Sequence, residues 1–297
     1  MEIITRRKRM VSVTRKARRE QDVTIGLVPT MGALHEGHLS LVREARRLCD
    51  VVVVSIFVNP MQFGPQEDFS HYPHDFTRDT ALLTDAHVDY IFAPTNEEVY
   101  QPGFATYITV EGLSNRLEGA SRPGHFRGVA TVVTILLNIV RPDFAFFGQK
   151  DAQQTIVIKR LARDLALDTE IVVRPTLREP DGLALSSRNI YLNPAERQAA
   201  PLLYNALKQA RARYVSGERI ASRLIEATRA IIAAEPLARL DYISLNDAET
   251  LEPLDMIEDE RAVLLSLAVK FGNTRLIDNT VLAPARRTTG ALGTVSV

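Results

Sequence analysis

Two apolar stretches, DVTIGLVPT at residues 22–30 and DVVVVSIFV at residues 50–58, decide the fold class. Both are short and rich in Val and Ile, which is typical of strands that are covered on both faces. Between them, HLSLVREARRL at residues 38–48 places most of its apolar side chains on one side of a helix and its charged side chains on the other. The three segments therefore predict a strand–helix–strand unit with parallel strands.

The same alternation continues to residue 176. The spacing of apolar residues predicts further helices over 80–86, 127–140 and 151–165, and further strands over 89–93, 143–147 and 169–174. Such alternation is typical of a doubly wound parallel sheet, an α/β fold that binds ligands at the carboxyl ends of its strands. Residues 1–176 are therefore predicted to form one domain.

The pattern changes after residue 176. A long helix is predicted over 194–215, because Asn193 and Pro194 favour a helix start. A helix over 221–234 and strands over 240–245 and 262–269 complete a smaller α+β domain at residues 177–283. Residues 284–297 are mostly small and polar without periodicity, so we expect a disordered tail there.

The composition is that of an ordinary folded protein. Of 297 residues, 45% are hydrophobic, and 36 Lys and Arg balance 36 Asp and Glu, so no overall charge attracts nucleic acid or an anionic membrane. The single cysteine, Cys49, excludes an intramolecular disulfide and suits a cytoplasmic location. No run reaches the roughly 20 apolar residues that cross a bilayer. The basic residues 6–9 lack the apolar segment of a signal peptide and are interpreted as the exposed face of a first helix.

The first candidate site is PTMGALHEGH at residues 29–38, between the first strand and the helix that follows. Gly32 and Gly37 permit close approach of the backbone to a ligand, and the helix directs its positive end toward the loop. His35 and His38 are three residues apart, so both can face an anion. A phosphate site is the direct interpretation, because a zinc-protease motif requires histidines four residues apart.

Three further clusters follow predicted strands or leave the first domain. GQKD at residues 148–151 places Lys150 at the same sheet edge as the first loop, where it can meet phosphates. LSSR at residues 185–188 combines two hydroxyls and a guanidinium, which suit a clamp on a polyphosphate. Gln62 follows the second strand and can meet Gln153 or Gln154 across the crevice, where neutral amides suit a small hydroxylated acid. His125 is interpreted as a surface or supporting residue.

Together these clusters resemble the pantoate–beta-alanine ligase family of the nucleotidyltransferase superfamily that shares a His-x-Gly-His signature. The likeness spans residues 1–283, and each motif stands in the family's order. The motifs are PTMGALHEGH from Pro29, NPMQFG from Asn59, SRPGHFRGV from Ser121, FGQKD from Phe147 and DGLALSSRN from Asp181.

The resemblance implies a fold, a reaction and partners. It implies a Rossmann-like amino-terminal domain, a smaller carboxyl-terminal domain and a cytoplasmic homodimer. It implies that ATP drives the joining of (R)-pantoate to beta-alanine through a pantoyl adenylate, with release of AMP and pyrophosphate. Mg²⁺ would accompany the ATP, and the product would supply coenzyme A synthesis.

The resemblance also implies residue roles. His38 would be the catalytic acid, with His35, Lys150 and Arg188 as further catalytic groups. Gln62 and Gln154 would bind pantoate, Gln62 would also bind beta-alanine, and Asp79 is the candidate partner of Mg²⁺. ATP would be bound by Met31, Gly32, Ala33, Leu34, His35, Glu36, Gly37, His38, Gly148, Gln149, Lys150, Asp151, Leu177, Leu185, Ser186, Ser187 and Arg188.

Two other functions agree with part of this pattern. A different nucleotidylyltransferase of the superfamily, which joins a phosphate ester to AMP, would use the same histidine loop. The uncharged Gln62, Gln153 and Gln154 favour a carboxylic acid over such a phosphorylated substrate. A catalytically silent nucleotide-binding protein would not need both histidines together with Lys150.

Overall fold

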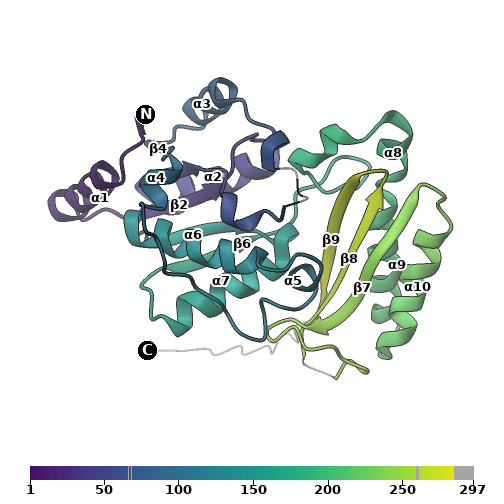
Figure 1. The fold of residues 1–297 in the computed structure, drawn as a ribbon. Helices are drawn as coiled ribbons and strands as arrows, with labels where there is room; N and C mark the ends of the chain where they lie inside the picture. The colour runs from purple at the N-terminus through teal and green to yellow at the C-terminus, as the bar shows by residue number, and fades with distance from the viewer. Residues whose placement is uncertain (66, 68, 259–260, 284–297) are drawn as a thin grey trace, which may run out of the picture.

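Two sheets organise the computed structural model, which describes residues 1–283 apart from residues 66, 68, 259 and 260 (Figure 1). A six-stranded parallel sheet has the order β1-β4-β3-β2-β5-β6, and a three-stranded antiparallel sheet has the order β7-β8-β9. This confirms the predicted fold class. The tail expected at residues 284–297 lies outside the described residues.

The parallel sheet is formed by short strands, most of which are apolar. Val28 of β2 and Val54 of β3 are fully buried, as expected for strands covered on both faces. The three-residue strand β1 was not predicted, because it is too short to show a period. The strands are β1 (Glu2–Ile4), β2 (Ile25–Thr30), β3 (Val51–Ile56), β4 (Tyr90–Phe92), β5 (Phe144–Gly148) and β6 (Glu170–Arg174).

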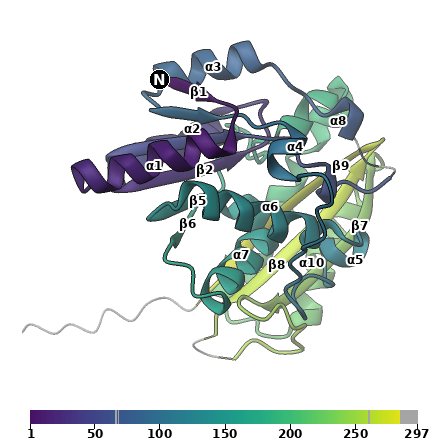
Figure 2. The same cartoon turned by 60° about the vertical axis from the view of Figure 1, so that its left-hand side comes forward.

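Helices cover both faces of this sheet, as Figure 2 shows from the side of α1. Val42 of α2 and Leu83 of α3 belong to one apolar cluster. Met10 of α1, Val133 of α6 and Ile158 of α7 belong to another. The helices are α1 (Arg7–Gln21), α2 (Glu36–Leu48), α3 (Phe76–Asp85), α6 (His125–Val140) and α7 (Ala152–Asp164), with the short α4 (Asn96–Val99) and α5 (Glu118–Ser121). Among the described residues, no helix is long and apolar enough to span a membrane.

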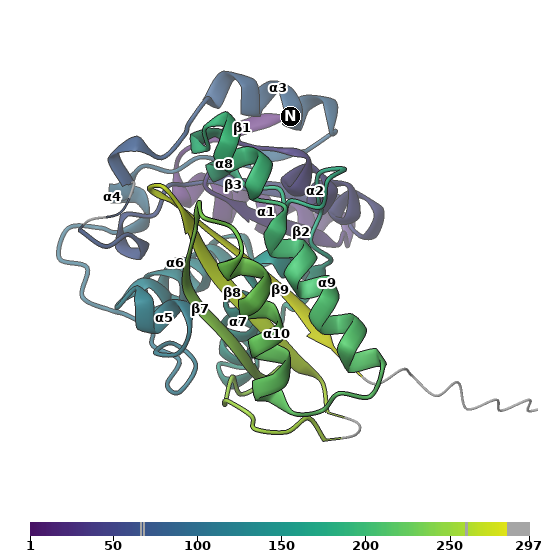
Figure 3. The same cartoon turned by 90° about the vertical axis from the view of Figure 1, so that its right-hand side faces the viewer.

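The smaller part of the chain pairs the antiparallel sheet with α9 and α10, which stand in front of it in Figure 3. Its own apolar cluster contains Leu203, Leu224 and Leu267 from these elements. The elements are α8 (Pro194–Ala199), α9 (Leu202–Val215), α10 (Ala221–Ala233), β7 (Ala238–Asp247), β8 (Val263–Phe271) and β9 (Thr274–Leu282).

The prediction of one helix over 194–215 was wrong, because the chain breaks into α8 and α9 at Ala200 and Pro201. Proline has no backbone N–H, and its ring clashes with the carbonyl four residues earlier, so it cannot continue a helix. It can begin the next helix. The break sets α8 apart from α9, and α9 then packs against the antiparallel sheet.

The smaller part touches the parallel-sheet part through β9. Arg275 forms a two-point ion pair with Glu118 of α5, with N···O distances of 2.6 and 2.9 Å. Asn279 donates to the carbonyls of Gln149 and Lys150, directly after β5. Strand β9 therefore lies beside the carboxyl end of β5.

Candidate active site

A cavity lies at the carboxyl ends of β2 and β5, which are neighbours in the sheet although β3 and β4 separate them in sequence. The strand order reverses at this place, which is where open α/β sheets bind ligands. The predicted residues that line the cavity are Met31, His35, Gly37, His38, Gln62, Gly148, Lys150, Asp151, Gln154, Leu177, Leu185, Ser186, Ser187 and Arg188. Gly32, Ala33, Leu34, Glu36 and Gln149 are not part of this lining.

The histidine loop caps its own helix. The backbone N–H of Gly37 donates to Nδ1 of His35 at 3.1 Å, and the N–H of His35 donates to Nδ1 of His38 at 3.3 Å. A Cβ at position 37 would lie 2.8 Å from the His35 ring, so a larger residue there would displace the ring that accepts the N–H of Gly37. Since each Nδ1 accepts a hydrogen bond, each neutral ring carries its own proton on Nε2. The two histidines therefore offer two Nε2–H donors at the cavity.

Both histidines are neutral at physiological pH. Burial, followed by the charge of Lys150, lowers the pKa of His35 from 6.5 to about 4. Burial, followed by the neighbouring His35, lowers the pKa of His38 to about 3. The ring centroids are 4.1 Å apart, so a charge on one ring opposes a charge on the other. The positive charge of this cavity therefore comes from side chains such as Lys150 and Arg188, not from the histidines.

Asp79 of α3 anchors the backbone of the histidine loop. Its two carboxylate oxygens accept the backbone N–H groups of Ala33 and Leu34 at 2.9 and 2.8 Å, and the residue is only 1% exposed. Gly32 and Ala33 have φ values of 83° and 50°, a left-handed backbone that these hydrogen bonds stabilise. Both oxygens already accept backbone protons, so the contacts of Asp79 are those of a loop anchor.

The loop after β5 is held by the smaller part of the chain. The side-chain amide of Asn279 donates to the carbonyls of Gln149 and Lys150 at 3.0 and 2.9 Å. The side chain of Gln149 donates back to Asn279 at 3.2 Å, which directs it away from the cavity. Nζ of Lys150 lies 3.6 Å from the carboxylate of Asp151. Strand β9 thus fixes the backbone that carries the lysine.

The Ser-Ser-Arg cluster forms part of η4 (Ser187–Tyr191) and reaches the histidine loop. The hydroxyl of Ser187 donates to the carbonyl of Ala33 at 3.1 Å. The hydroxyl of Ser186 accepts the N–H of Arg188, whose guanidinium lies 5.9 Å from the centre of the Tyr72 ring. The three clusters that were predicted separately therefore meet at one cavity.

Gln62 lies at the end of η1 (Pro60–Gln62) and is oriented in part by Asn59, a residue that had no predicted role. Its Oε1 accepts the amide of Asn59 at 3.1 Å, and its Nε2 lies 3.0 Å from the sulfur of Met31. Asn59 is 1% exposed and accepts the hydroxyl of Tyr100 at 2.6 Å. This polar cluster could not be predicted because Tyr100 lies 41 residues from Asn59 in sequence.

The two neighbouring glutamines of α7 have different roles. Gln154 lines the cavity, as predicted for one of the pair. Gln153 is buried and donates to the carbonyls of Leu113 and Arg116 at 2.9 and 2.7 Å. It also accepts the N–H of Glu118 at 2.9 Å. Gln153 therefore holds the segment before α5 and is not available to a ligand.

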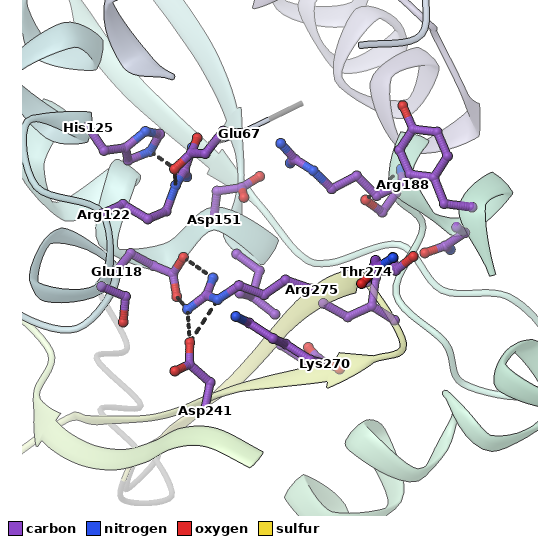
Figure 4. A pocket seen from close by; sticks show the side chains of 18 of the residues that line it. Glu67, Glu118, Arg122, His125, Asp151, Arg188, Asp241, Lys270, Thr274 and Arg275 are labelled. Atoms are coloured by element: carbon purple, nitrogen blue, oxygen red, sulfur yellow. Dashed lines mark hydrogen bonds and ion pairs between the residues drawn. The ribbon is translucent and has the colours of Figure 1, made fainter. Parts of the chain in front are cut away.

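A second pocket adjoins this cavity between α5, α6 and β9 (Figure 4). Its lining includes Arg275, which pairs with both Glu118 and Asp241, and Arg122, which pairs with Glu67. Lys150 and Arg188 line both spaces, which therefore form one continuous site. Among the described residues, no group of three or more His, Cys, Asp or Glu side chains is arranged to hold a metal ion.

A parallel sheet whose reversal point carries an imidazole loop, a lysine and an arginine is typical of α/β proteins that bind phosphorylated ligands. The family model described as pantoate-beta-alanine ligase matches residues 2–281. The chain therefore belongs to the pantoate–beta-alanine ligase family.

Individual relatives agree with this assignment. The pantothenate synthetase of Chloroflexus aurantiacus is 58% identical over 272 residues, which are 92% of this chain and 96% of that protein. The pantothenate synthetase of Pelotomaculum thermopropionicum is 56% identical over 264 residues, which are 89% and 93%. A crystal structure of pantothenate synthetase from Thermus thermophilus has a TM-score of 0.89 at 46% identity, covering 96% of this chain and 100% of that one.

A further solved relative was crystallised with ligands. Pantoate-beta-alanine ligase from Francisella tularensis, complexed with beta-gamma ATP and beta-alanine, has a TM-score of 0.77 at 36% identity. The match covers 95% of this chain and 97% of that one.

Proposed function

We propose that this protein joins (R)-pantoate to beta-alanine at the expense of ATP, releasing AMP and pyrophosphate. The observation that carries the proposal is the convergence at one cavity of the histidine loop, the lysine loop, the Ser-Ser-Arg cluster and two cavity-lining amides, Gln62 and Gln154. Membership of the pantoate–beta-alanine ligase family supports it, as does the ATP and beta-alanine complex of the Francisella relative.

The first step would activate the acid. A carboxylate is a poor electrophile, so an oxygen of pantoate attacks the α-phosphorus of ATP, pyrophosphate leaves, and a pantoyl adenylate forms. Negative charge develops on the phosphoryl and leaving oxygens. Lys150 and Arg188 supply positive charge beside them, and the Nε2–H groups of His35 and His38 supply neutral donors that need no protonation. The lowered pKa values of the histidines are compatible with this role, but they do not fit the catalytic acid that the resemblance implied for His38, because the ring has no imidazolium proton to give at physiological pH.

The second step would form the amide. The neutral amine of beta-alanine attacks the acyl carbon of the adenylate, the C–O bond to AMP breaks, and the amine loses a proton. Gln62 lines both the cavity and the adjoining pocket, so its amide can contact a ligand in either space. Holding two reactants in contact can contribute on the order of 7–11 kcal/mol to such a step.

Mg²⁺ belongs to the proposal as a partner of the phosphates. In phosphoryl-transfer sites this ion is held by one or two carboxylates and by substrate oxygens, and it neutralises charge on the phosphates. Asp151 lines the cavity with a half-exposed carboxylate and fits that requirement. Asp79, the Mg²⁺ partner that the family resemblance implied, does not line the cavity, and both of its oxygens accept backbone protons. A cytoplasmic homodimer is proposed on the family resemblance.

The test is AMP release from ATP and Mg²⁺ with (R)-pantoate, measured with and without beta-alanine, followed by mass detection of the product. We expect amine-dependent turnover that yields pantothenate. A folded protein that binds ATP but forms neither AMP nor pantothenate would refute the proposal. AMP transfer to a phosphate ester would instead support another nucleotidylyltransferase activity.

A further inference from the structure

The SRPGHFRGV motif has no role in the reaction described above, yet it contacts the residue proposed to bind both acids. His125 is the first residue of α6, and its imidazole lies between two segments. Its Nδ1 lies 2.8 Å from the backbone carbonyl oxygen of Gln62. Its Nε2 lies 3.1 Å from the guanidinium of Arg122. The ring therefore bridges a fixed cation and the backbone of Gln62.

The chemistry of these two partners fixes the protons of the ring. A carbonyl oxygen only accepts, so Nδ1 of His125 must carry the proton and donate it to Gln62. A guanidinium only donates, so Nε2 must be unprotonated and accept from Arg122. His125 is therefore the neutral Nδ1–H tautomer, opposite to the tautomer of His35 and His38.

Arg122 is itself held in place (Figure 4). Its Nε and one terminal nitrogen contact the two carboxylate oxygens of Glu67 at 2.7 and 2.5 Å. The side chains of Arg122 and Glu67 are 18% and 24% exposed, so solvent competes little with this two-point pair. Contacts thus run from Glu67 through Arg122 to the Gln62 carbonyl, by way of His125 at 2.8 Å and directly from Arg122 at a longer 3.4 Å.

The segment that carries Gln62 is also pressed against α6. A Cβ at Gly128 would lie 2.2 Å from the carbonyl oxygen of Met61, so only glycine permits this approach. The carbonyl of Gly128 accepts the amide of Asn59, which in turn holds Oε1 of Gln62. Position 62 is thereby fixed on its side chain by Asn59 and on its backbone by His125.

We propose that His125 is a positioning residue, which fixes the backbone of Gln62 so that its amide meets pantoate; the inference rests on the proposed function of Gln62. His125 does not itself take part in bond formation. Burial, followed by the charge of Arg122, lowers the pKa of His125 to about 4, which keeps the required tautomer neutral at physiological pH. Gln62 would hold its orientation before substrate arrives.

Two substitutions separate the two nitrogens of the ring. In His125→Asn the amide nitrogen can occupy the place of Nδ1 and still donate to Gln62. In His125→Gln the amide oxygen can occupy the place of Nε2 and accept from Arg122, but the short hydrogen bond to the Gln62 carbonyl is lost and only the 3.4 Å contact from Arg122 remains. We expect His125→Gln to raise the KM for pantoate roughly tenfold, the size of one lost hydrogen bond, with the KM for ATP within about twofold. His125→Asn should stay within about threefold of wild type for both substrates.

His87→Gln is the matched control, because His87 is exposed in the turn before β4 and lines neither space of the site. It should leave both KM values unchanged. Thermal unfolding of each variant identifies those that fail to fold. If His125→Gln is unfolded, Arg122→Lys takes its place. This variant breaks the two-point pair with Glu67 and should also raise the KM for pantoate selectively. Equal changes for pantoate and ATP, or equal defects in Asn and Gln variants, would overturn the inference. Wild-type turnover is measured in the same assay. If the wild-type protein forms no pantothenate, the proposed function fails, whereas normal wild-type turnover with unchanged KM values in the variants would refute only the role of His125.

Discussion

At His35 and His38, the backbone decides which ring nitrogen carries the proton. Each Nδ1 accepts a backbone N–H, and burial keeps both rings neutral, so both Nε2–H groups remain as donors. The sequence predicted that these histidines share a site. It could not predict their protonation, because that depends on how deeply the loop is buried and on Lys150, which is more than 100 residues away in sequence.

The role of His38 can be separated from its charge. His38→Ala removes the Nε2–H donor and should lower pantoate-dependent exchange of pyrophosphate into ATP about 100-fold, the usual loss for one donor to a developing oxyanion. His38→Gln can place an amide N–H near the same point and should retain more of the exchange than the alanine variant. Exchange at the wild-type rate in His38→Ala would contradict the role.

The lowered histidine pKa values also predict a pH dependence of stability. His35, His38 and His125 take up protons near pH 6.5 when unfolded, but only near pH 4 or below when folded. Between these values the unfolded state binds more protons, so the free energy of unfolding should fall as the pH drops from about 6.5 toward 4. Urea unfolding across this range checks the slope. A His35→Gln, His38→Gln double variant should show a shallower slope than wild type, and equal slopes would contradict the explanation.

Among elements, the loop between β2 and α2 depends on a third element, α3. Asp79 accepts the N–H groups of Ala33 and Leu34, a contact that could not be predicted because residues 79 and 33 are 46 positions apart. Strand β9 was not predicted, because its buried polar residues Asp278 and Asn279 interrupt the apolar pattern of a strand. Most of the other strands and helices could be predicted, because the face that each of them buries is apolar along its length and so shows a regular spacing of apolar residues in the sequence.

Asp79→Ala leaves two backbone donors without a partner and should lower the free energy of unfolding by about 1–3 kcal/mol, as well as weaken ATP binding. Asp79→Asn keeps one acceptor and should lose less. Chemical denaturation and ATP titration measure the two effects. If Asp79 only anchors the loop, added Mg²⁺ cannot restore the lost hydrogen bonds to the backbone. Recovery of ATP binding by Asp79→Asn at raised Mg²⁺ would therefore contradict the anchor and support a role of Asp79 in binding the metal.

At the scale of the whole molecule, the site needs both parts of the chain. Lys150 follows β5 and Arg188 lies in η4. Asn279 and Arg275 of β9, in the smaller part of the chain, hold the loop after β5 and helix α5. The general location of the site could be predicted because neighbouring parallel strands present their carboxyl ends at one edge. The contribution of β9 could not, because it arises only when the antiparallel sheet packs against that edge.

Asn279→Ala tests this contribution. The variant removes the donors to the carbonyls of Gln149 and Lys150, and should lower kcat about tenfold, the effect of about 1.4 kcal/mol in the transition state. Asn246→Ala is the matched control, since Asn246 is similarly buried in the smaller part but donates to the carbonyl of Leu251, and neither residue lines the site. Steady-state kinetics of both variants, at temperatures where each is folded, make the comparison. Similar losses of kcat in the two would contradict a specific role for β9.

Transfer of oxygen from acid to nucleotide tests the central claim most directly. We would supply (R)-pantoate with ¹⁸O in both carboxylate positions, together with ATP, Mg²⁺ and beta-alanine, and weigh the products by mass spectrometry. If the carboxylate attacks the α-phosphorus, AMP gains one ¹⁸O and the amide product keeps the other. AMP without label, with ¹⁸O in pyrophosphate or inorganic phosphate, would contradict the adenylate route through this cavity.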